Sequence, residues 1–327
     1  MNYYLYKLKF TSAVHFGSGD SARSLDSSEM TFCADTLFSA LCHIAVKAGK
    51  LDKLVECVKT DRIKFSDSMP YVGDEFYVPK PYIAGEGHID ADPSKYKKME
   101  KLHYLPLSML AAFFASIKGK KSFDADTVYA DFGKIHVAEK VSVAGLNSTT
   151  PYMVSLFNFE NVDAEDNNDC GLYGIIGYED VDELNFVKEL IQFVGIEGIG
   201  GKVSSGYGKF ELYDEIWLDE PFDDDTKALN NMLYRSNASR YILLTSSLPS
   251  EKELVKVTEK SSYKLKRRAG FVNSKYVAPT VKKKTQYFFA AGSVFLQPYS
   301  GELFDVGNNL PHPVYRYSKP IFLGVDL

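Results

Sequence analysis

Six glycines lie in one short connection between a predicted helix and a predicted strand. The segment GIEGIGGKVSSGYGKFEL spans residues 195–212. Before it, Asp180–Gly195 has acidic residues in its first turn and apolar residues at helical spacing. Each glycine costs about 0.5–1 kcal/mol relative to alanine in regular structure. The segment is therefore predicted to be an irregular loop that needs unusual turns or brings backbone close to a ligand.

The order of the predicted elements around this loop indicates the fold. They are a strand at Tyr3–Phe10, a helix at Ala34–Gly49, strands at Tyr152–Glu160 and Cys170–Glu179, a helix at Asp180–Gly195, and a strand at 207–218. This βαββαβ order is the ferredoxin-like (RRM-like) pattern. The region around 66–150 is less regular and is interpreted as an insertion into this fold.

A second α+β region is predicted after the acidic run DEPFDDDTKA (219–228). We therefore place one domain at 1–220, with the insertion around 66–150, and a second at 221–327. Within the second domain, YFFAAGSVFLQP (287–298) is predicted to be a hairpin. In the first domain, Asp35 or a neighbour is expected to cap the helix that begins near Ala34.

Charge is distributed unevenly along the 327 residues, although the net charge is only −5. Nine basic and no acidic residues lie within 260–290, and nine acidic and no basic residues lie within 160–183. This asymmetry favours one face for a polyanion and another for solvent or a basic partner protein. Two solvated charged surfaces would explain it equally well, so both interpretations remain open.

Cofactor, metal and membrane motifs are not recognised. Gly201-Lys202 is followed by Val203, so the glycine-rich loop does not match the nucleotide-binding P-loop, and the dinucleotide pattern fails at the same place. The histidines have no metal-ligand spacing, and the four cysteines form no CxxC pair. No apolar run reaches the length of a membrane span, and the N-terminus lacks a signal-peptide pattern. We expect no cofactor, no bound metal, no membrane contact and a cytoplasmic location.

The glycine-rich loop has the residue types that hold a nucleic-acid backbone. Phosphate oxygens can accept hydrogen bonds from exposed N–H groups of the loop, from the hydroxyls of Ser204 and Ser205, and from the ammonium of Lys202. Tyr207 offers a ring on which a base can stack. A flexible connection whose glycines only allow positive φ is the alternative, and the loop alone does not decide between them.

Seven separated motifs resemble one family. They are VHFGSG, ADTLFSALC, VPKP, KKMEKLHYLPL, RRAGFVNSKYVAP, GSVFLQPYSGELFDVG and HPVYRYSKPIFLGV. Together they are similar, in the same order and over nearly the whole chain, to the Csm-four family. That family comprises the Cas-five-like RAMP subunits of type III-A CRISPR effector complexes.

The resemblance implies two ferredoxin-like domains and a thumb-like element in the region 66–150. It implies a non-catalytic subunit that binds the 5′ tag of the CRISPR RNA (crRNA) and caps one end of the filament. The partners implied are the large polymerase-like signature subunit and the neighbouring backbone RAMP subunit. The RNA-binding residues expected on this basis are His15, Arg23, Lys80, Gly200, Gly201, Lys202, Ser204, Ser205, Gly206, Tyr207, Arg267, Arg268, Phe271, Lys282, Lys283 and Lys284.

Two other functions remain open from the sequence. A metal-independent CRISPR RNA endoribonuclease of RAMP type would use histidine as general acid or base, and His15 and His43 are the candidates. A purely structural subunit would make no direct RNA contact. That last hypothesis predicts that charge reversal at Lys202 and Arg267 leaves RNA binding unchanged.

Overall fold

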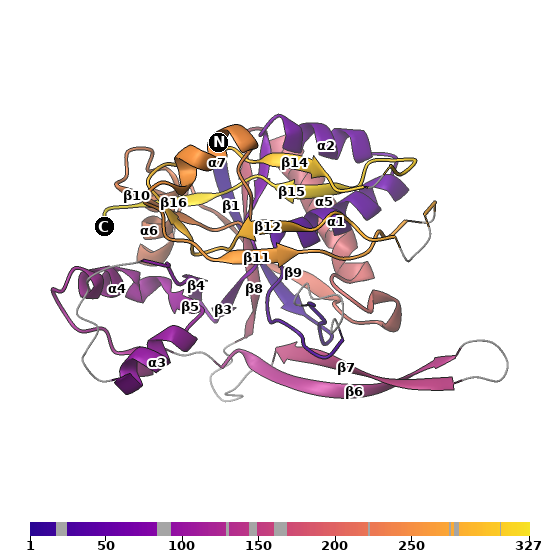
Figure 1. The fold of residues 1–327 in the computed structure, drawn as a ribbon, viewed down its shortest axis with the longest axis horizontal. Coiled ribbons are helices and arrows are strands. Elements are labelled where there is room, and N and C mark those ends of the chain that lie inside the picture. Colours follow the sequence, from indigo (N-terminus) through magenta and orange to yellow (C-terminus); the bar gives the residue numbers. More distant parts are fainter. Residues whose placement is uncertain are drawn as a thin grey trace.

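The computed structural model describes residues 1–17, 25–83, 93–128, 131–143, 149–159, 169–221, 223–274, 276–277, 281–307 and 309–327 (Figure 1). Arg23, one of the expected RNA-binding residues, lies outside these ranges. The helices within them are α1 (Ala34–Lys47), α2 (Leu51–Lys59), α3 (Pro93–Lys101), α4 (Leu110–Ile117), α5 (Val181–Glu197), α6 (Asp224–Leu233) and α7 (Glu251–Thr258). The strands are β1 (Asn2–Phe10), β2 (Ile63–Phe65), β3 (Met69–Val72), β4 (Glu75–Pro79), β5 (Tyr104–Pro106), β6 (Gly133–Val143), β7 (Thr149–Phe159), β8 (Cys170–Tyr178), β9 (Phe210–Trp217), β10 (Arg240–Leu243), β11 (Leu265–Arg268), β12 (Gln286–Phe289), β13 (Val294–Phe295), β14 (Glu302–Asp305), β15 (Tyr315–Ser318) and β16 (Phe322–Val325).

A seven-stranded antiparallel sheet forms the centre of the molecule. Its order is β5-β4-β3-β8-β1-β9, and β2 also pairs with β8. Successive side chains of a strand point to opposite faces. Tyr4 and Tyr6 of β1 belong to one hydrophobic cluster, whereas Leu5 between them belongs to another. Both faces of the sheet are therefore covered.

Helices cover one face of the sheet, and the C-terminal part of the chain covers the other. Phe38 of α1 and Leu190 of α5 pack in the cluster of Tyr4 and Tyr6. On the opposite face, Leu5 clusters with buried residues of α6, β10 and β16, among them Leu229, Ile242 and Leu323. Tyr317 of β15 returns to the helical side, where its ring centroid lies 5.6 Å from that of Phe38. The two predicted domains therefore share their hydrophobic cores.

The sequence assigned the second strand of the βαββαβ order wrongly. The strand predicted at Tyr152–Glu160 exists as β7, but β7 pairs with β6 along eleven residue pairs and not with β8. The neighbour of β8 is instead β3, from Met69–Val72, together with β2. Part of the predicted insertion thus belongs to the central sheet. The rest of the predicted insertion includes β6, which forms with β7 a long hairpin that projects along the lower side of the molecule (Figure 1).

Two local predictions also differ from the structure. The segment 287–298 is not a hairpin, because β12 pairs with β11 whereas β13 pairs with β10. Asp35 does not cap α1, since it lies inside the first turn. The N–H of Ala34 donates instead to the Asp67 carboxylate at 2.8 Å, from a loop distant in sequence. In both cases the actual partner, a paired strand or a capping side chain, comes from a part of the chain that local sequence patterns do not connect.

Candidate RNA interface

The glycine-rich loop joins the end of α5 to β9 and folds tightly against its own protein. A Cβ added at five of its glycines would lie only 2.0–2.7 Å from another heavy atom, at Gly195, Gly198, Gly200, Gly201 and Gly208. At Gly206, whose φ is +87°, a Cβ would meet nothing within 4 Å. Five glycines therefore serve close packing within the fold. Of the six, Gly206 alone leaves room for a ligand at the position of its missing side chain.

His15 fixes the glycine-rich loop to the β6–β7 hairpin. Its backbone carbonyl accepts the N–H of Gly201 at 2.8 Å, and its Nδ1 lies 2.8 Å from the carbonyl oxygen of Ser155 in β7. Since a carbonyl can only accept, Nδ1 is the donor in this contact. The side chain is buried, with 3% of the residue exposed. His15 thus has a clear structural role in positioning the loop, while its contact with RNA stays a prediction.

The hairpin and the loop also contact each other through cation–aromatic pairs. The ammonium of Lys202 lies 4.4 Å from the ring centroid of Tyr152 on β7 and donates to its hydroxyl at 3.2 Å. The ammonium of Lys140 on β6 lies 5.0 Å from the ring centroid of Tyr207. Lys202 and Tyr207 are half-buried by these contacts, whereas Ser204 is exposed. The loop therefore presents its serine turn outward with the hairpin beside it.

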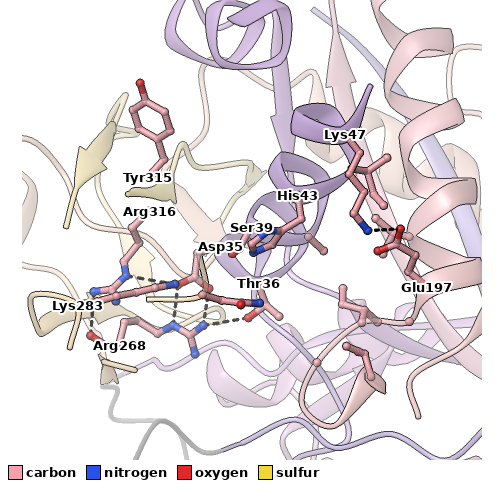
Figure 2. Close-up of a pocket in the computed structure, with 18 of the residues that line it drawn as sticks. Asp35, Thr36, Ser39, His43, Lys47, Glu197, Arg268, Lys283, Tyr315 and Arg316 are labelled. Carbon is pink, nitrogen blue, oxygen red and sulfur yellow. Dashed lines mark hydrogen bonds and ion pairs between the residues drawn. The ribbon is translucent and has the colours of Figure 1, made fainter. Parts of the chain in front are cut away.

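A cleft of about 390 Å³ lies where the glycine-rich loop, α1 and the C-terminal ribbons meet (Figure 2). Gly198, Gly200 and Val203 line it from the loop, and His43 lines it from α1. The C-terminal region contributes a further set of lining residues, which are Arg268, Ala269, Asn273, Lys283, Tyr315 and Arg316. The structure therefore brings three of the expected RNA-binding residues, Gly200, Arg268 and Lys283, to one cavity.

A buried ion cluster forms one wall of this cleft. The guanidinium of Arg268 donates through Nε to one oxygen of Asp35 at 2.9 Å and through Nη2 to the other oxygen and to Thr36. Arg316 Nε lies 3.8 Å from the same carboxylate. Figure 2 shows these side chains and Lys283 together on one side of the cleft, opposite the Lys47–Glu197 pair. Three cationic side chains thus gather around a single carboxylate.

The pKa values follow from this arrangement. Burial alone would raise the pKa of Asp35, but the charges of Arg268 and Arg316 outweigh it, so the pKa is lowered and the carboxylate stays ionised. Burial, followed by the charge of Arg316, lowers the pKa of Lys283. With Asp35 matching only one of the three cations, the wall keeps an excess of about two positive charges. Such a wall attracts an anionic group into the cleft.

His43 faces the same cleft but carries little charge near neutral pH. Burial, followed by the charges of Lys283 and Lys47, lowers its pKa. His15 does not line the cleft. The two histidines considered as catalytic candidates are therefore not combined in this cavity.

The remaining expected residues lie at other places around the C-terminal ribbon formed by β11 and β12. Because side chains alternate along a strand, Arg267 is exposed on the opposite face of β11 from Arg268. Phe271 and Lys282 face each other across the ribbon, with the ammonium 5.9 Å from the ring centroid. Lys284 is exposed. Lys80, at the end of β4, donates to the carbonyl of Met99 and does not line the cleft.

Sequence analysis missed Arg316 and did not assign Asp35 to a binding site. Arg316 is 4% exposed and donates to the backbone carbonyls of Arg268 and Lys284 as well as facing Asp35. It stands in the alternating run YRYS, where one arginine between two tyrosines suggests only a strand. No local signal showed that this side chain points inward.

The described part of the chain gives no sign of a metal centre or a membrane span. Its histidine, cysteine and carboxylate side chains form no group of three or more that could hold a metal ion. Its helices are all too short or too polar to cross a membrane.

Family comparisons define first the class of protein and then the family. Residues 7–211 match the model of the RAMP superfamily, and residues 236–325 match that of the CRISPR Csm4 C-terminal domain. The "CRISPR system Cms protein Csm4" of Mycobacterium tuberculosis strain H37Rv is 32% identical, over 99% of this chain and 98% of its own. The protein of the same name from Streptococcus thermophilus is 30% identical over 100% of both chains. The chain thus belongs to the Csm4 family of CRISPR proteins.

Solved structures share the fold over the full length. One is the crystal structure of the Csm3–Csm4 subcomplex in the type III-A CRISPR-Cas interference complex, with a TM-score of 0.61 and 18% identity over 100% of both chains. Another is the Csm1–Csm4 cassette in complex with cA4, with a TM-score of 0.61 and 17% identity over 100% of this chain and 99% of the other. At this level of identity the likeness establishes the fold alone.

Proposed function

We propose that this protein is a non-catalytic subunit of a type III-A CRISPR effector complex and binds the 5′ tag of the crRNA. The observation that carries the proposal is the cleft beside the glycine-rich loop, where Arg268, Arg316 and Lys283 face one carboxylate, Asp35. Membership of the Csm4 family of CRISPR proteins supports RNA as this anion. A phosphodiester in the cleft would offset the excess positive charge.

The surroundings of the cleft fit a single-stranded RNA. Its volume of about 390 Å³ falls within the range typical of sites for small ligands, about 300–1,000 Å³. The exposed hydroxyls of Ser204 and Ser205, beside the open position at Gly206, can bind the backbone at the rim. Arg267, Phe271 and Lys282 on the neighbouring ribbon offer cationic and aromatic contacts to bases that leave the cleft.

We also propose that the protein caps the filament and contacts both the large polymerase-like subunit and the adjacent backbone RAMP subunit. Support comes from its family, since related Csm4 proteins were crystallised with Csm3 and with Csm1. The β6–β7 hairpin would be the thumb-like element. It is tied to the glycine-rich loop by His15 and Lys202, so a contact along the hairpin would also orient the RNA site.

The domain boundary and the ferredoxin-like character stay part of this proposal. The order β3-β8-β1-β9, with α1 and α5 on one face, supports a ferredoxin-like N-terminal domain over 1–220. For 221–327 the ferredoxin-like assignment rests on the resemblance alone. In the described part of 259–327 the chain forms strands and no helix.

The cleft gives little support to the endoribonuclease alternative. Metal-independent cleavage needs one group to deprotonate a 2′-hydroxyl and another to protonate the leaving oxygen. His43 is the sole histidine among the described lining residues, while the Nδ1 of His15 is held by Ser155. A protein that binds the tag and leaves it intact fits these positions better.

The test is binding of labelled crRNA, with and without its 5′ tag, to the protein assembled with its partner subunits. We expect tag-dependent binding, intact RNA, and a loss of affinity in Lys283→Glu. Lys252→Glu on the exposed side of α7 is the matched control and should behave as wild type. Equal binding of both RNAs, or no effect of Lys283→Glu, would leave a structural subunit without RNA contact. Cleavage that disappears in His43→Ala would establish the endoribonuclease.

A further inference from the structure

A second group of basic side chains lies at the opposite end of β11 from the cleft. It consists of Lys80 after β4, His103 before β5 and Lys264 before β11, and we call it the distal cluster. The N–H of Lys80 donates to the carbonyl of His103 at 2.9 Å. The ammonium of Lys264 lies 4.5 Å from the ring centroid of Tyr82. Three segments that are distant in sequence thus bring these basic side chains together.

In the distal cluster the like charges act more strongly than the opposite charges of Glu100 on Lys80 and of Glu29 on His103. Burial and then the charge of Lys264 lower the pKa of Lys80. Burial, followed by Lys264 and Lys80, lowers the pKa of His103, so its imidazole, like that of His43, carries little charge near neutral pH and the excess charge comes from the two lysines. None of the three forms an ion pair with a described carboxylate, whereas nearby Lys266 pairs with Glu29 at 2.9 Å. Like charges held close together without a directly paired carboxylate favour an anionic ligand.

Strand alternation connects this cluster with the cleft. Lys264, Lys266 and Arg268 are two residues apart, so their side chains lie on the same face of β11. The N–H of Ala290 donates to the carbonyl of Lys264, which continues the ribbon to that residue. Lys266 is neutralised by Glu29 and Arg268 by Asp35. Excess positive charge therefore remains at the two ends of the row, about 13 Å apart at roughly 3.3 Å per residue.

We propose that the distal cluster binds a second phosphodiester of the same RNA, which would run along the β11 ribbon from the cleft to the end of β4. The proposal rests on the proposed RNA-binding function. RNA is favoured over an acidic protein segment because the two ends of one continuous row carry the same kind of excess charge. A backbone that repeats its phosphates at regular intervals can occupy both ends at once. Tyr82 and Lys264 would then lie where the RNA leaves the protein.

The experiment compares Lys264→Gln with Lys252→Gln, an exposed lysine on α7, as control. Lys264 is exposed, so its substitution should leave the fold intact. Assembled complexes would bind labelled tag RNAs, shortened one nucleotide at a time from either end, over a series of salt concentrations. On RNAs long enough to span the row, Lys264→Gln should reduce the slope of log affinity against log salt by about 0.7, the value for one phosphate of a single strand. On shorter RNAs whose affinity still falls in Lys283→Gln, the Lys264→Gln substitution should not change this slope.

The outcomes separate this inference from the proposed function. If Lys283→Gln weakens binding but Lys264→Gln changes nothing at any RNA length, the distal site is refuted and the cleft stands. If neither Lys283→Gln nor Lys264→Gln changes RNA affinity, or if the wild-type complex binds no RNA, both proposals fail. If Lys264→Gln leaves RNA binding intact but reduces recovery of a partner subunit, the cluster contacts protein and the inference is wrong.

Discussion

The substitution Asp35→Asn should lower the stability of the protein and raise its affinity for RNA. The side chains of Asp35 and Arg268 are 8% and 14% exposed and share two hydrogen bonds. Removing one partner of a buried ion pair typically costs about 3–5 kcal/mol, because the other charge is left without compensation. For 327 residues, an unfolding entropy of about 2.1 cal/mol/K per residue converts this loss into a Tm decrease of about 4–7 °C.

RNA affinity should change in the opposite direction. The variant removes the carboxylate that pairs with Arg268 and lies near Arg316 and Lys283, so the excess positive charge of the cleft rises by one. Binding at low salt should therefore become tighter and more sensitive to salt. Thermal unfolding and a binding titration on the same preparation measure both effects. Asp126→Asn is the control, because the Lys98–Asp126 pair is half-exposed and should contribute at most about 1 kcal/mol.

The pH dependence gives this prediction a further check. The pKa of Asp35 is lowered in the folded state, so its ionised form stabilises the protein above the ordinary carboxyl pKa. That contribution is lost as the pH falls through the lowered pKa. The stability difference between wild type and Asp35→Asn should therefore have its full size at neutral pH and disappear at strongly acidic pH. An unchanged Tm, or a loss of RNA affinity alongside the loss of stability, would refute this account of the cleft.

Three further predictions concern the loop, the core and His43. Gly208→Ala should destabilise the protein more than Gly206→Ala in chemical denaturation. The reason is that an added Cβ meets a backbone oxygen at 2.0 Å at Gly208 and open space at Gly206. Equal losses of stability would show that positive φ alone requires these glycines. Tyr317→Phe should cost about 1–3 kcal/mol, since the buried hydroxyl accepts the N–H of Phe65 at 2.7 Å and its removal leaves that donor unsatisfied; a change below about 0.5 kcal/mol would mean that water replaces it. His43→Gln should leave RNA affinity unchanged between pH 7 and 8, because its lowered pKa keeps the imidazole neutral there, and a clear drop in a binding titration would contradict this.

The glycine-rich loop shows how far local patterns reach. Its position between a helix and a strand was predicted correctly, since α5 ends at Glu197 and β9 begins at Phe210. The reason for most of its glycines was not visible in the sequence. They allow contact with His15, Phe210 and other parts of the protein that only the folded chain brings near. A role for the loop in holding RNA stays a prediction, and the serine turn at Gly206 is the place where it can apply.

The sequence by itself determined the elements that local physics defines. The helices α1 and α5 and the strands β1, β8 and β9 follow from short-range periodicity and residue type. The motifs that resemble the family are likewise present in the sequence itself. The tertiary structure decided which strands pair, because a strand pattern was visible for β7 and not for the short β3, yet packing makes β3 the neighbour of β8. The tertiary structure also decided which cationic side chains reach the cleft. Alternation along β11 turns Arg268 into the cleft and Arg267 outward, and a distant strand supplies Arg316. Charges at a site act over distances in space, and the sequence records only distances along the chain.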